Sequence, residues 1–213
     1  MTRSRALVFA AVAAGLLYTI GAVALGANPP RATDSGAQVV SWFREHAHSV
    51  RTYAWTFTFG TVAFAVAAAL LRRALPSPHR DVFFLGATAF VIETALQAWV
   101  WAGLALHPRS VDGSTARALL DMASFWGPIL TGTTMTMIGA VTVLGFGGAP
   151  RIPRWLTVLG LIAFTEQALE TVTVFGTRGF TAPGGDMNVV LGAGLTAIWL
   201  GGLVVWGARK LSP

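Results

Sequence analysis

Long apolar runs alternate with short polar connections along the whole chain. Six of these runs reach the roughly 20 residues that an α-helix needs to cross the hydrocarbon core of a bilayer. The apolar residues are continuous and lack the alternation of membrane-barrel strands, so the pattern predicts helices. We therefore expect an all-α integral membrane bundle, with residues 1–213 forming a single transmembrane helical domain. The expected membrane-spanning segments are residues 6–27, 50–71, 82–106, 118–146, 155–175 and 187–208.

The composition supports a membrane environment. Only 11% of the residues are charged and 54% are hydrophobic, whereas a soluble domain carries roughly 25% charged residues. Cysteine is absent, which excludes disulfides, thiolate metal sites and cysteine nucleophiles. The net charge of +6 comes from arginines at predicted helix ends, where they anchor a membrane protein. The lipid bilayer is the expected partner, and no nucleic acid is expected.

The positive residues that flank the segments predict the orientation. With the N-terminus inside, nine Lys and Arg residues lie inside and six lie outside, and positive residues favour the cytoplasmic side. We expect a multi-pass protein of the cell (plasma) membrane with both termini cytoplasmic. The first segment could also be a signal peptide, because Ala22-Val23-Ala24 offers a cleavage site. An uncleaved helix is favoured, since residues 6–27 are longer than a typical signal h-region.

The first outer connection contains a short amphipathic pattern. Asp34 and Ser35 are candidate N-caps, and Val39, Phe43 and Ala47 follow at four-residue spacing. This pattern predicts a short helix on the outer membrane interface.

Small residues predict where helices approach one another. Ala10 with Ala14, and Ala197 with Gly201, are four residues apart and would permit close helix packing. Residues 127–128, Gly-Pro, should bend the fourth segment, with nearby threonines bonding the freed carbonyls.

Carboxyl groups inside the predicted spans are the most informative feature. An Asp at the centre of a spanning helix costs roughly 2.5 to 3.5 kcal/mol on insertion scales. Glu93 and Gln97 share one face of the third segment, and Glu166 and Glu170 share one face of the fifth. Both segments run in the same direction, so the two polar stripes are expected to face each other at similar depth. Asp121 lies near the outer end of the fourth segment.

This carboxylate cluster has a functional and a structural interpretation. No Arg or Lys lies at mid-depth, so a protonated carboxyl, a shared proton or a bound cation would balance the charge. In the structural interpretation, neutral carboxyls bond Gln97, Gln167 and neighbouring threonines between helices. In the functional interpretation, an outward-open cavity binds or transports a cation, a proton or a small polar solute. The predicted ligand-binding or proton-coupling residues are Glu93, Gln97, Asp121, Glu166 and Glu170.

Two other functions stay open. A membrane enzyme acting on a lipid or isoprenoid would use paired carboxyls as acid and base, and would need an apolar pocket continuous with the lipid. A non-catalytic accessory subunit would instead show an exposed face of small residues. Six helices are few for a monomeric transporter, so a homo-oligomer or a membrane partner is expected. The sequence identifies no cofactor, and it predicts no metal site, because His46 and His48 would point to different helix faces.

Several short motifs occur along the chain in a set order. They are Asn28-Pro-Pro-Arg31 with the stretch around Trp42, Pro153-Arg-Trp-Leu156 with Gly160, Ala182-Pro-Gly-Gly185, and the late Trp199. In these motifs the chain resembles an uncharacterised, largely actinobacterial family of polytopic membrane proteins with a domain of unknown function. The resemblance implies a multi-helix membrane fold and transfers no activity, and the carboxylates are not part of its pattern.

Overall fold

The protein is a multi-pass membrane protein built from α-helices, as expected. The computed structural model describes residues 2–26, 28–147 and 152–212, and every regular element in these ranges is helical. All six expected membrane-spanning segments are confirmed, because each coincides with a helical stretch long and apolar enough to cross a bilayer. The main helices of these segments are α1 (Arg3–Leu25), α3 (Ala47–Arg72), α4 (His79–Leu106), α6 (Trp126–Gly147), α7 (Arg154–Glu170) and α8 (Ala193–Lys210).

Shorter elements extend or connect the membrane-spanning helices. α2 (Gly36–Glu45) precedes α3, and α5 (Gly113–Ser124) leads into α6. The 3₁₀ turns η1 (Thr171–Phe175) and η2 (Gly179–Thr181) follow α7. A π-helical turn, η3 (Met187–Gly192), opens the sixth segment and continues directly into α8.

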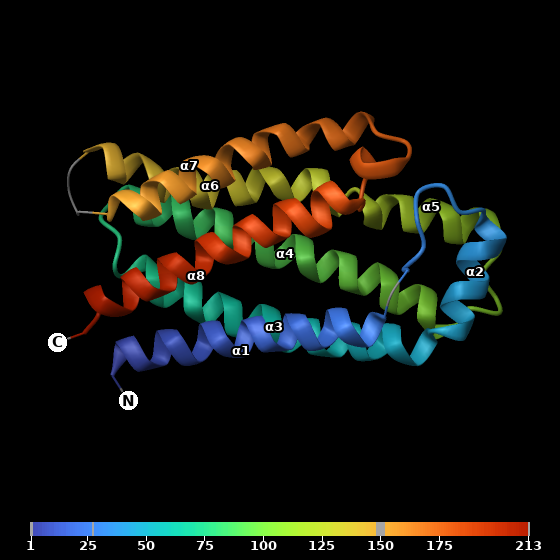
Figure 1. Cartoon of the computed structure of the whole chain (residues 1–213). Coiled ribbons are helices and arrows are strands. Elements are labelled where there is room, and N and C mark those ends of the chain that lie inside the picture. The colour runs from blue at the N-terminus through green and yellow to red at the C-terminus, as the bar shows by residue number, and fades with distance from the viewer. Residues whose placement is uncertain (1, 27, 148–151, 213) are drawn as a thin grey trace.

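The helices pack mainly on their neighbours in the sequence. α1 packs on α3, α3 on α4, α4 on α6, and α6 on α7, while α8 contacts both α7 and α1. Both termini lie at one end of the bundle, which we call the terminal end, and α2 and α5 lie at the other, which we call the capped end (Figure 1). α8 crosses the bundle obliquely, from the terminal end toward the connection that follows α7 (Figure 1).

A dense apolar core closes the terminal end. Leu7, Phe83, Met137 and Leu203 are fully buried there. At Gly207 of α8, a methyl group would lie only 2.6 Å from Leu71 on α3 and 3.3 Å from Leu7 on α1. α8 can therefore approach α1 and α3 closely at this end because residue 207 has no side chain.

The amphipathic helix predicted before the second span is present as α2. Ser35 is its N-cap, and the Ser35 hydroxyl and the Gln38 side chain form a reciprocal capping box. Val39 and Phe43 are buried in a second apolar core, which includes Leu120 of α5. The apolar face of α2 thus packs on the protein at the capped end.

In the fourth segment a single residue, Phe125, separates α5 from α6. Helical hydrogen bonds continue across it, from the Phe125 N–H to the Asp121 carbonyl and from the Ile129 N–H to the Phe125 carbonyl, so the bend expected at residues 127–128 stays a prediction. Of the threonines near this point, Thr133 and Thr134 donate their hydroxyls to the carbonyl oxygen of Leu130.

α2 and α5 cross at their first residues, and this crossing yields a test. A methyl group on Gly36 would overlap the carbonyl of Gly113, and neither backbone can move without shifting a helix. We expect Gly36→Ala to lower the free energy of unfolding by about 1 to 3 kcal/mol, measured by thermal unfolding in detergent. Gly103→Ala is the control, because nothing lies within 4 Å of its added methyl group. Equal stability of the two variants would contradict the crossing.

Asp112 caps α5 and makes the stability depend on pH. Its carboxylate accepts hydrogen bonds from the Ser114 hydroxyl, the Thr115 hydroxyl and the Thr115 N–H, which hold the pKa of Asp112 well below its usual range. A lowered folded-state pKa stabilises the protein above the unfolded-state pKa of about 3.9, and this contribution is lost as the pH falls below that value. We expect the difference in melting temperature between the wild type and Asp112→Asn to shrink from about pH 4 downward. A constant difference would refute this role of the carboxylate.

Candidate functional site

An apolar cavity of about 600 Å³ lies inside the bundle. Its walls come from α1, α3, α4, α6, α7, η3 and α8. Side chains such as Ala11, Phe64, Phe90 and Leu200 line most of it. The volume lies within the range of about 300 to 1,000 Å³ that is typical of small-molecule sites.

The cavity opens sideways between α1 and α8. Val8 and Val12 of α1 and Val205 of α8 line it, yet their side chains are 42%, 54% and 48% exposed. These residues lie inside membrane-spanning helices, so their exposed surfaces face lipid. The cavity is therefore continuous with the hydrocarbon region of the bilayer.

Polar groups collect at the end of the cavity nearer the capped end. Glu170 at the end of α7, Gln167 one turn earlier and Asn188 of η3 all line the cavity and are almost fully buried. The hydroxyls of Tyr18 and Thr196 lie in the same walls. An apolar space with a few convergent polar groups is the usual form of a binding site.

A hydrogen-bond network joins these side chains, which we call the polar cluster: Glu166, Gln167, Glu170 and Asn188. Gln167 Nε2 donates to Glu166 Oε2 at 2.9 Å and to Glu170 Oε2 at 2.7 Å. Asn188 Nδ2 donates to Glu170 Oε1 and, at 3.4 Å, to Thr173 Oγ1. Two carboxyl groups thus share one amide nitrogen, and α7 is tied to the start of the last span.

The chain path around η3 brings Asn188 to the network. The Gly184 N–H donates to Asn188 Oδ1 at 2.9 Å, which fixes the orientation of the amide. A methyl group on Gly192, at the end of η3, would overlap the Glu170 carboxyl group. The π-helical turn therefore places a residue without a side chain against the carboxyl group, and such turns often occur at functional sites.

The structure does not bring the two predicted polar stripes together. Glu93 Oε2 accepts a hydrogen bond from Thr133 of α6 at 2.9 Å, and Gln97 Oε1 accepts one from Tyr53 of α3 at 3.0 Å. The neighbour of Glu93, Thr94, lines the cavity instead. The expectation failed because α4 packs against α3 and α6, which take up the polar groups of that stripe.

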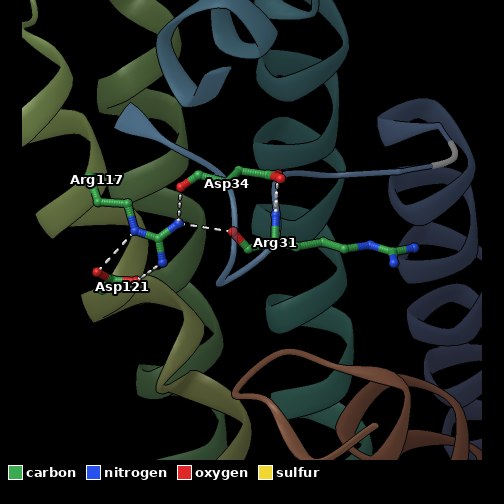
Figure 2. Close-up of polar contacts among 4 residues, drawn as sticks. All are labelled: Arg31, Asp34, Arg117 and Asp121. Atoms are coloured by element: carbon green, nitrogen blue, oxygen red, sulfur yellow. Dashed lines mark hydrogen bonds and ion pairs between the residues drawn. The ribbon is translucent and has the colours of Figure 1, made fainter. Parts of the chain in front are cut away.

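Asp121 also lies apart from the polar cluster. It pairs with Arg117 one turn earlier on α5, and Arg117 Nη1 donates to the carbonyl oxygens of Arg31 at 2.9 Å and Asp34 at 2.8 Å. Figure 2 shows the guanidinium group between the Asp121 carboxylate and the connection that precedes α2. We call this arrangement the Arg117 clasp; it fastens that connection to α5.

Of the five predicted site residues, only Glu170 is among the residues that line the cavity. Glu166 does not line it, but it accepts a hydrogen bond from Gln167, which does. The sequence analysis missed Tyr18, Asn188 and Thr196. A signal existed for the last two, because they are the hydrogen-bonding Asn and Thr side chains of an otherwise apolar sixth segment. Ala197 and Gly201, expected to permit close packing, line the cavity instead.

No family model, no curated protein and no solved structure matches this chain. The resemblance to the actinobacterial membrane proteins therefore stays a prediction.

The Arg117 clasp predicts a local effect on the capped end. Arg117→Met keeps the length and apolar stem of the side chain but removes its donors to the two backbone carbonyls. We expect faster amide hydrogen exchange in residues 31–35, with little change in the spanning helices. Arg109→Met, at an exposed position of the same end, serves as the control. Unchanged exchange in both variants would show that the clasp does not hold the connection.

Proposed function

We propose that this protein binds an amphiphilic molecule drawn from the membrane. The apolar part of the ligand lies in the cavity between α1 and α8, and its polar head lies against the polar cluster. Orientation follows from the flanking charges: with both termini in the cytoplasm of the cell, the polar cluster belongs to the outer half of the bilayer.

The observation that supports this proposal best is the sideways opening of an apolar cavity that ends at buried polar groups. A ligand in the bilayer would reach the site without crossing water. A small polar solute suits the space less well, because most of the lining is apolar and would leave the solute's polar groups without hydrogen bonds.

Binding is favoured over catalysis at this site. The cavity meets the requirement set for a membrane enzyme, an apolar pocket continuous with lipid. An acid and a base acting together would both have to reach the substrate, however, and of the two carboxyl groups in the polar cluster only that of Glu170 lines the cavity. Transport would require in addition a second state in which the ligand leaves at the other side of the membrane.

Two glycines of α8 allow a matched test. Gly201 lines the cavity and Gly194 does not, and at both positions nothing lies within 4 Å of an added methyl group. We expect Gly201→Leu to fill part of the cavity and to weaken binding of dodecylamine and 1-dodecanol at least about tenfold. This is the effect of removing about two buried methylene groups of the ligand's alkyl chain from the cavity. Gly194→Leu should bind like the wild type. Equilibrium binding to protein in bilayer nanodiscs, corrected for partitioning into empty discs, measures the effect.

Two results would refute the proposed function. One is equal binding by the two leucine variants while both remain folded, since the cavity would then not be the site. The other is absence of saturable binding of either dodecyl compound to the wild type above that of empty discs.

A further inference from the structure

The charge and hydrogen-bonding groups at the polar end of the cavity indicate the chemical class of the ligand's head group. We infer that the site takes a long-chain primary amine, whose ammonium group binds between Glu170 and Thr196 at the polar end of the cavity. This inference rests on the proposed function and specifies its ligand class.

The donors of the polar cluster are already used. An amide nitrogen offers two N–H groups, and both of those on Gln167 point to carboxyl groups. Both of those on Asn188 are directed to Glu170 and Thr173. A ligand head that needs donors from the protein, such as a carboxylate or phosphate, finds none free among these amides.

Other buried polar atoms near the cluster have no hydrogen-bond partner among the described residues; among them the hydroxyls of Tyr18 and Thr196 can accept as well as donate. Glu166 Oε1 is buried without a hydrogen-bond partner in the described part of the chain, and so is the hydroxyl of Thr196. The side chain of Thr196 is only 6% exposed and belongs to the cavity wall, one helical turn beyond Gly192, which abuts Glu170. Buried polar atoms without partners are costly, so a ligand head that donates a hydrogen bond to the Thr196 hydroxyl would stabilise this end of the cavity.

The charge balance points to the same ligand. The ion pairs found among the described residues join Arg72 and Arg80 to Asp81, and Arg117 to Asp121; none involves the polar cluster. Two neighbouring carboxyl groups in an apolar setting need a proton or a cation. An ammonium group supplies a positive charge and three donors with no acceptor, which complements two carboxyl groups that have no cationic partner among the described residues.

A comparison of head groups on one chain tests this assignment. In wild-type protein at pH 7, in nanodiscs, we expect dodecylamine to bind roughly 10- to 100-fold more tightly than 1-dodecanol, the range for a hydrogen bond to a charged group. Dodecyltrimethylammonium, which has the charge but no N–H donor, should bind more weakly than dodecylamine. Lysophosphatidylethanolamine, which carries an amine behind a phosphate, should compete poorly.

Amino-acid substitutions test which residues cause the preference for the amine over the alcohol. Glu170→Gln should bring the ratio of amine to alcohol affinity close to one while leaving alcohol binding nearly unchanged. Glu93→Gln is the matched control, because that carboxyl group bonds Thr133 and does not line the cavity. Thr196→Val removes a hydroxyl without changing the charge of the cluster, and should lower amine affinity several-fold even if Glu170→Gln does not fold.

Equal affinity for dodecylamine and 1-dodecanol in the wild type would overturn the assignment of an amine. The proposed function would survive that result if Gly201→Leu still weakened both compounds. Equal binding of lysophosphatidylethanolamine and dodecylamine would overturn the restriction to amines without phosphate. An undiminished amine preference in both Glu170→Gln and Thr196→Val would place the head elsewhere and refute the inference.

Discussion

The last span packs on its neighbours through close contacts at glycines. Gly207 of α8 lies against α1 and α3 at the terminal end, Gly202 lies against Trp155 and Leu156 of α7, and Gly192 at the end of η3 lies against Glu170. These contacts involve different neighbours along the span, and α8 crosses the bundle obliquely (Figure 1). The crossing closes the ring of helices at the terminal end and leaves the space between α1 and α8 open further along. The cavity is thus a consequence of helix packing and not of any single side chain.

The polar cluster is stabilised by the same arrangement. Its carboxyl groups would be costly next to lipid, but α7 and η3 surround them with amide donors. The last turn of α7, the connection after it and the π-helical turn therefore act as one unit. Asn188 contributes to this unit both through its side-chain donors and through the Gly184 N–H that it accepts.

The sequence predicted the fold well and the site only in part. Continuous apolar runs specify spanning helices because the bilayer demands that every backbone group be bonded within its own helix, and all six segments were correctly placed. Which helix faces meet is decided by packing between segments, which a single sequence does not encode locally. Glu93 and Glu166 look equivalent in the sequence, yet one bonds a threonine of α6 and the other belongs to the polar cluster through Gln167. The cavity itself left no pattern beyond small residues and two isolated polar side chains in the last segment.

The contribution of α8 to the site has a consequence for biosynthesis. Helices α1 to α7 pack largely on the helix made just before them, so they can associate as they enter the membrane. Asn188 and Thr196 enter with the last span. Until then Glu170 has the amide of Gln167 as a donor but lacks that of Asn188, and the wall opposite α1 is missing. During synthesis the nascent chain therefore passes through a stage in which acidic side chains face lipid or translocon, and insertion of the final helix both completes the site and ends that exposure.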